Sequence, residues 1–151
     1  MSVDPNQADP LEVETRVQAS PDVVFAFFID PDKYRRWQGR GAELDPHPGG
    51  TYRVDMDRTN VVLGEYVEVD PPNRVVFTLG FEGNPALPPG ASRVEVTLIP
   101  DGDGTIVRLR HSGLPDEEAR EQHLMGWRLF LDRLALAASG RDPGPAPLDA
   151  E

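Results

Sequence analysis

Apolar and polar residues alternate along most of this chain, a pattern typical of β-strands with one face in water. The segment LEVETRVQ shows it first, because Leu11, Val13, Thr15 and Val17 alternate with polar residues. A short strand opens the segment 42–50, and the same alternation predicts strands at 51–57, 61–70, 74–81, 93–100 and 105–111. Turns rich in proline, glycine and aspartate separate these segments, which favours an antiparallel sheet built from hairpins.

Two segments change to the helical period. Residues 20–29 begin with Ser20, a good N-cap, and Pro21, which fits the first helical position. A further helical turn ends near Trp37, and a much longer helix is expected from about Pro115 to Ser139, where Gly140 ends it. The apolar residues of this long helix recur at helical spacing and are Leu124, Trp127, Leu131, Leu134 and Ala138.

The order of these elements predicts an α+β fold: one strand, a pair of short helices, five or six further strands and the long helix. A long amphipathic helix must bury its apolar side, and the apolar face of the sheet is the surface available for it. We expect one domain over residues 11–139, with disordered tails at 1–10 and 140–151, since 151 residues suffice for a single core.

Composition narrows the classes of function. The formal net charge is −11, which disfavours nucleic acid and anionic membranes as partners because both attract basic surfaces. The chain has no cysteine, so thiol catalysis, disulfides and cysteine-based metal sites are excluded. The polar N-terminal segment does not look like a signal peptide, and we expect a cytoplasmic protein, monomeric or homodimeric.

Several segments together resemble a known family. VQASPDVVFAFFIDPDKYRRW, DPHPGGTYRV, GEYVEVDPPNRVVFT, GTIVRLRHSGL and HLMGWRLFLDRL occur in this order. Over residues 11–138 the chain resembles the activator of Hsp90 ATPase homologue family, part of the START-like (SRPBCC) superfamily that includes the birch-pollen allergen. The resemblance implies a helix-grip fold: a seven-stranded antiparallel sheet wrapped around the C-terminal helix, two short helices between the first two strands, and an apolar cavity between sheet and helix.

The resemblance also implies a function, because small bacterial members are usually described as stress-related proteins or binders of small hydrophobic molecules. We therefore expect a small hydrophobic or amphipathic ligand in the cavity, with no cofactor. The inward-facing sides of the strands and of the long helix give the candidate cavity residues: Tyr52, Val54, Met56, Phe77, Leu79, Val96, Leu98, Val107, Leu109, His111, Trp127, Phe130 and Leu131. Trp37, at the end of the short helices, is a further candidate that either borders the mouth of the cavity or covers one end of the core. Of these, His111 and Tyr52 are the expected polar groups that orient the ligand.

The pair Gly126-Trp127 has two interpretations, because a glycine inside a helix is unfavourable by ~1 kcal/mol relative to alanine. Gly126 either lets a sheet residue or a ligand approach the helix, with Trp127 on the cavity wall, or it relieves crowding beside a tryptophan that belongs to the core.

Two alternative functions stay open at this point. A cyclase or dehydratase acting on a polyketide-like substrate would require His111 or Glu65 to face the cavity with a shifted pKa. Alternation does not decide the direction of Glu65, because Gly64 is a candidate bulge position. A chaperone-accessory protein would instead have a filled core and an exposed apolar patch near Leu87, Pro88 and Pro89. The three histidines lack the spacing of metal ligands, so no metal is expected.

Overall fold

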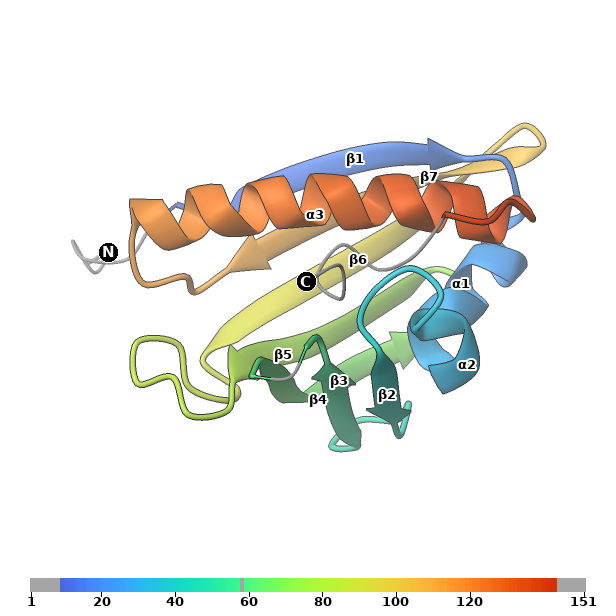
Figure 1. Ribbon diagram of the computed structural model, residues 1–151. Coiled ribbons are helices and arrows are strands. Elements are labelled where there is room, and N and C mark those ends of the chain that lie inside the picture. The colour runs from blue at the N-terminus through green and yellow to red at the C-terminus, as the bar shows by residue number, and fades with distance from the viewer. Residues whose placement is uncertain (1–8, 58, 144–151) are drawn as a thin grey trace.

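A seven-stranded antiparallel sheet curls around one long helix in the computed structural model, which describes residues 9–57 and 59–143 (Figure 1). The strands are β1 (Leu11–Val17), β2 (Gly41–Leu44), β3 (Thr51–Asp55), β4 (Val61–Asp70), β5 (Arg74–Phe81), β6 (Ser92–Asp101) and β7 (Gly104–Ser112). Their order in the sheet is β1-β7-β6-β5-β4-β3-β2. The predicted α+β helix-grip architecture is therefore confirmed.

The in/out alternation sets the two faces of the sheet. In β7, Val107, Leu109 and His111 are fully buried, whereas Arg108 and Arg110 are exposed. On the outer face Glu14 of β1 lies opposite Arg108, and their side chains form an ion pair with a nitrogen–oxygen distance of 2.8 Å. A cross-strand ion pair is thus present on the water-facing side of the sheet.

A bulge in β4 decides the direction that alternation leaves open. The register with β5 shifts between Tyr66 and Glu68, so Val67 is the extra residue. Tyr66 is buried and Glu65 is exposed, which places the Glu65 carboxylate on the outer face. Gly64 lies close against the carbonyl of Thr78 on β5, and a Cβ there would collide with that backbone.

Two short helices, α1 (Pro21–Ile29) and α2 (Pro31–Tyr34), connect β1 to β2. Ser20 is the N-cap of α1 but makes no side-chain capping bond, whereas the Asp30 carboxylate accepts bonds from the first backbone N–H groups of α2.

The long helix α3 (Glu117–Ala138) follows β7. The side chain of Asp116 caps it by accepting a 2.8 Å hydrogen bond from the backbone N–H of Ala119, so the helix begins two residues after the predicted start at Pro115. At the other end Gly140 adopts a φ of +87°, the left-handed conformation that its position after the helix predicts.

An aromatic cluster fills one end of the space between α3 and the sheet. The Trp37 ring packs 5.2 Å from the Phe28 ring and 4.8 Å from the Tyr34 ring, and Tyr52 stacks on Phe77 with ring centroids 4.1 Å apart. The buried guanidinium of Arg133 ties the cluster to α3, because its Nε donates to the Trp37 carbonyl over 3.1 Å. The carboxyl-terminal half of α3 therefore packs directly against the hydrophobic core.

The predicted tails at 1–10 and 140–151 lie largely outside the described residues. At the two limits of the described chain, the carbonyls of Asp9 and Pro143 accept hydrogen bonds from Arg120 and Arg133 of α3.

Candidate functional site

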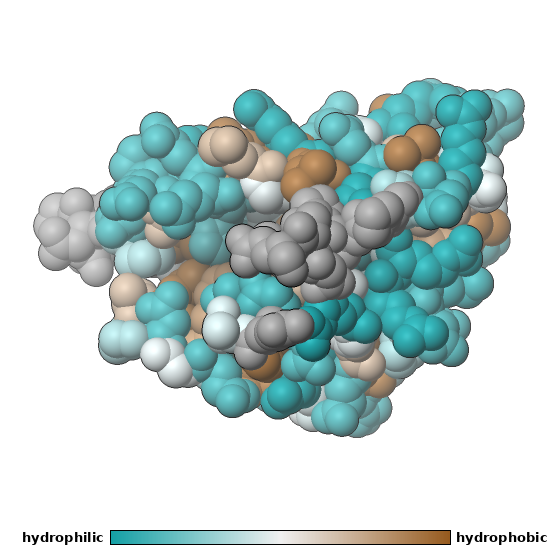
Figure 2. Space-filling view, in the orientation of Figure 1, coloured by the Kyte–Doolittle hydropathy of each residue, from teal (hydrophilic) through white to brown (hydrophobic). Residues whose placement is uncertain are grey.

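A cavity of about 330 Å³ lies between the amino-terminal half of α3 and the sheet, beyond the aromatic cluster. In the space-filling view of Figure 2, hydrophobic residues lie in a hollow beneath this half of the helix. The cavity is lined by Gln38, Met56, Asp57, Asn60, Val62, Leu79, Phe81, Gln122, His123, Gly126, Trp127, Leu129 and Phe130.

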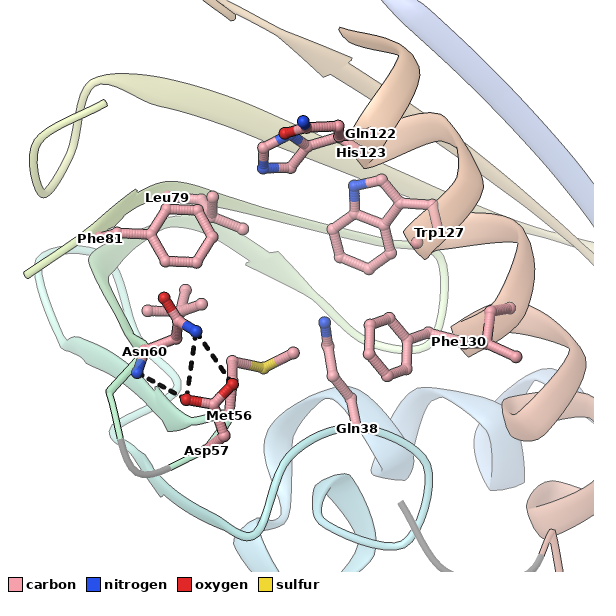
Figure 3. A pocket seen from close by; sticks show the side chains of 13 residues that line it. Gln38, Met56, Asp57, Asn60, Leu79, Phe81, Gln122, His123, Trp127 and Phe130 are labelled. Carbon is pink, nitrogen blue, oxygen red and sulfur yellow. Dashed lines mark hydrogen bonds between the residues drawn. The ribbon is translucent and has the colours of Figure 1, made fainter. Parts of the chain in front are cut away.

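Most of the wall is apolar. Trp127 projects from α3 toward Leu79 and Phe81 on β5, and Phe130 projects toward Gln38 and Met56 (Figure 3). Four of the residues expected at the cavity from the sequence thus lie on its wall: Met56, Leu79, Trp127 and Phe130.

The other expected residues belong to the closed core and do not line the cavity. They are each no more than 3% exposed and comprise Trp37, Tyr52, Val54, Phe77, Val96, Leu98, Val107, Leu109, His111 and Leu131. The polar atoms of two of them are already used: the Trp37 indole donates to the Phe27 carbonyl over 2.9 Å, and the Tyr52 hydroxyl is hydrogen-bonded to that of Tyr34. Alternation correctly identifies which side chains face the helix. It does not show where along that face the helix and the sheet separate and leave a cavity.

His111 is hydrogen-bonded to Trp127 and does not line the cavity. The Leu79 carbonyl can only accept, so the Ser92 hydroxyl donates to it over 2.6 Å. Ser92 Oγ then accepts from His111 Nε2 over 2.8 Å, and His111 Nδ1 accepts from the Trp127 indole over 3.0 Å.

Burial of the ring, with a smaller contribution from His123, lowers the pKa of His111 to about 3. A neutral imidazole with both nitrogens bonded holds Trp127 in place, which differs from the orienting role expected from the sequence.

His123 is the histidine on the wall. Its Nδ1 carries the proton, because it lies 2.8 Å from the carbonyl of Ala119, which can only accept. The Nε2 atom therefore presents a lone pair, and burial lowers the pKa of the ring so that it is neutral at pH 7. The ring packs between Phe81, with centroids 5.9 Å apart, and His111, at 5.2 Å. Helical spacing indicates this position from the sequence, because His123 lies one turn before Trp127.

Gln38 is a wall residue that no sequence signal indicated. It is 6% exposed, and its Oε1 accepts a 2.6 Å hydrogen bond from the hydroxyl of Tyr34. The amide nitrogen points into the space between Met56 and Phe130 (Figure 3).

The carboxylate of Asp57, at the edge of the cavity, is hydrogen-bonded to residues of its own turn. It accepts bonds from the backbone N–H groups of Thr59 and Asn60 and from both of their side chains. These bonds, the Asn60 amide first, lower the pKa of Asp57 to about 2. The carboxylate therefore shapes the β3–β4 turn and is a poor acid or base.

Gly126 faces empty space. Apart from its two chain neighbours and the backbone of its own helix, a Cβ built at this position would meet no atom within 4 Å, although the residue lies inside α3. No residue of the sheet approaches the helix closely at Gly126, and the residue lines the cavity.

A second hollow of about 350 Å³ adjoins the first and shares Asn60, Phe81, Gln122 and His123 with it. The rings of Phe81 and His123, whose centroids are 5.9 Å apart, are thus common to both hollows. Leu87, which lines the second hollow, is only 4% exposed and joins the apolar core. The exposed apolar patch that a chaperone-accessory protein would have at this residue is therefore absent at Leu87, because the 82–91 loop turns the side chain inward.

Residues 9–57 and 59–143 contain no cluster of three His, Asp or Glu side chains close enough to hold a metal ion. No helix formed by these residues is long and apolar enough to cross a membrane.

Comparison with solved structures places the fold among known proteins. The AHSA1-like protein from Rhizobium etli is 40% identical, covers 99% of this chain with 94% of its own and superposes with a TM-score of 0.73. CalU16 from Micromonospora echinospora is 28% identical over 93% of this chain and 72% of its own, with a TM-score of 0.76. The Aha1 dimer from Colwellia psychrerythraea, 15% identical over 88% of this chain and 98% of its own, shares the fold with a TM-score of 0.78.

Sequence comparison gives the family. No curated protein matches the chain significantly. The model of the family described as activator of Hsp90 ATPase homolog 1-like protein matches residues 18–138, which include every helix and all strands after β1. The chain is therefore a member of the activator of Hsp90 ATPase homolog 1-like family.

Proposed function

We propose that this protein binds a small, mostly apolar molecule in the cavity between α3 and the sheet. The observation that carries the proposal is the open space at Gly126, where the helix has a residue without a side chain and no atom of the sheet moves in to fill the gap. Protein interiors are normally close-packed, so a space of about 330 Å³ lined by Trp127, Phe130, Leu79 and Phe81 favours a ligand site over core.

Binding fits the wall better than catalysis does. The enzyme hypothesis required His111 or Glu65 in the cavity, but His111 is bonded through both nitrogens and Glu65 is exposed on the outer face. The volume lies at the low end of the range for small-molecule sites, so the ligand is compact. Burial of its apolar surface would supply ~25 cal/mol per Å² before ordering losses.

The test is a fluorescence titration with N-phenyl-1-naphthylamine, a neutral apolar probe. Wild-type protein is compared with Gly126→Leu, which fills the cavity, and with Arg128→Leu, which adds the same side chain to an exposed position of α3. We expect Gly126→Leu to weaken binding about tenfold or more, equivalent to ~1.4 kcal/mol, and Arg128→Leu to leave it unchanged. Equal binding by wild type and Gly126→Leu, or no binding by wild type, would overturn the proposal.

A further inference from the structure

We propose that the cavity selects neutral ligands whose apolar body has a hydrogen-bond acceptor at one end, received by Gln38, and a donor at the other, received by His123. This inference rests on the proposed function and specifies the chemical class of its ligand.

Gln38 is a donor held in one orientation. Its Oε1 accepts from the Tyr34 hydroxyl over 2.6 Å, and the Tyr34 hydroxyl is bonded in turn to that of Tyr52. Burial raises the pKa of both tyrosines, so both hydroxyls keep their protons at any ordinary pH. Because the amide oxygen is committed to Tyr34, the NH₂ group is the part that points into the cavity (Figure 3). A ligand carbonyl or ether oxygen is its complement.

His123 is an acceptor held in one tautomer. Its Nδ1–H donates to the Ala119 carbonyl over 2.8 Å, and its ring is fixed between the rings of Phe81 and His111. No residue in the described part of the chain donates a hydrogen bond to Nε2, which lies on a residue that lines the cavity. A ligand hydroxyl or N–H group is its complement, since a lone pair on a neutral imidazole can only accept.

The two polar groups lie toward opposite ends of an apolar wall. The carbonyl of Trp37, next to Gln38, is bonded to Arg133, which lies ten residues after His123 on α3. At 1.5 Å per helical residue, this places Gln38 and His123 on the order of 10–15 Å apart along the helix axis. Trp127 and Phe130 occupy the stretch between them (Figure 3). The matching ligand is therefore elongated, with polar atoms at its ends.

Charge disfavours acids in this class. Asp57 contributes a carboxylate to the lining, and the whole chain has a formal net charge of −11. No lysine or arginine is among the described residues that line the cavity, so these residues offer an anionic ligand no partner charge in exchange for its lost hydration.

Four probes with one ethylbenzene skeleton test the inference. They are 4-hydroxyacetophenone, which has a polar group at each end, acetophenone, which has only the acceptor, 4-ethylphenol, which has only the donor, and ethylbenzene, which has neither. Affinities are measured by titration of ¹⁵N-labelled protein, whose spectrum also reports whether each variant is folded. Each neutral hydrogen bond is expected to raise affinity about two- to tenfold, so 4-hydroxyacetophenone binds most tightly and ethylbenzene least.

Two variants assign each gain to a residue. Gln38→Met is expected to abolish the gain from the carbonyl and keep the gain from the hydroxyl, and His123→Phe is expected to do the reverse. Ethylbenzene, which has no polar group, should bind both variants as it binds wild type. In the wild type, the ¹⁵N resonance of His123 Nε2 should shift with 4-ethylphenol and not with acetophenone, which tests the inference even where a variant fails to fold.

The outcomes distinguish the inference about the two polar ends of the ligand, called here the polar-end inference, from the proposed ligand binding on which it rests. If all four probes bind wild type equally, or the gains are lost in the opposite variants, the polar-end inference is wrong while ligand binding stands. If none of the four binds, both proposals fail.

Discussion

Replacing Gly126 with alanine separates the stability of the helix from the function of the cavity. The residue lies well inside α3, and a Cβ there meets no atom within 4 Å, so the substitution adds no clash. Glycine in a helix interior is less favourable than alanine by roughly 0.5–1 kcal/mol. The free energy of unfolding of Gly126→Ala should therefore rise by about 0.5–1 kcal/mol, which raises Tm by about 1–4 °C for a domain of this size.

The same methyl group enters the space that the ligand would occupy. Affinity for N-phenyl-1-naphthylamine should fall while stability rises, which is the signature of a glycine kept for a binding site. Urea unfolding followed by circular dichroism gives the first quantity, and fluorescence titration gives the second. Arg128→Gly provides the matched control, because it should lower stability by up to ~1 kcal/mol at an exposed position of the same helix and leave binding unchanged.

A loss of stability in Gly126→Ala would refute the reasoning, because it would mean that an atom of the folded protein occupies the space in front of the helix. A gain in stability with unchanged affinity would show that the glycine has no part in binding.

Three further predictions concern the groups around the cavity. Burial holds the pKa of His111 at about 3 in the folded protein, against ~6.5 in the unfolded chain. The contribution of His111 to the free energy of unfolding should therefore be complete above pH 6.5 and fall by up to ~1.4 kcal/mol per pH unit as the pH drops toward 3. His111→Gln, whose amide can still accept from Trp127 and donate to Ser92, should flatten this slope in urea titrations at several pH values; an unchanged slope would contradict the assignment. Trp127→Phe should abolish the change in tryptophan emission that ethylbenzene causes, since the remaining Trp37 is fully buried in the core with its indole bonded to Phe27; a persisting change would place the probe elsewhere. Arg133→Met leaves the Trp37 carbonyl unpaired and should lower the free energy of unfolding by ~1–3 kcal/mol, with a loss below 0.5 kcal/mol in urea titration arguing against the role of this bond.

The alternation of the strands predicted the faces of the sheet because burial on one face is a local, periodic property. Val107, Leu109 and His111 are buried as their register indicates. The direction of Glu65 could not be predicted, because the bulge at Val67 depends on how β4 pairs with β5 and leaves no clear mark in the sequence.

The cavity was predicted less well than the fold because its position depends on where two layers separate. Met56, Leu79, Trp127 and Phe130 were found, since they are apolar and face inward. Gln38 was missed because it lies in a loop, and its contact with the cavity depends on the aromatic cluster that holds it. His111 was placed on the correct face, but the hydrogen bonds that occupy both its nitrogens come from strand β6 and helix α3, far away in sequence.

The hydrogen-bond chain from Trp127 through His111 and Ser92 to Leu79 has a consequence for motion. It ties α3 to β7, β6 and β5 in one continuous relay at the inner end of the cavity. Lifting the helix away from the sheet would break every link and leave buried polar groups unpaired, so that opening is among the most unfavourable local fluctuations of the domain. Ligands would therefore enter sideways, through the hollow beneath α3, while the helix stays in place. In hydrogen exchange the indole N–H of Trp127 would then belong to the slowest class, and the amides of the 82–91 loop to the fastest.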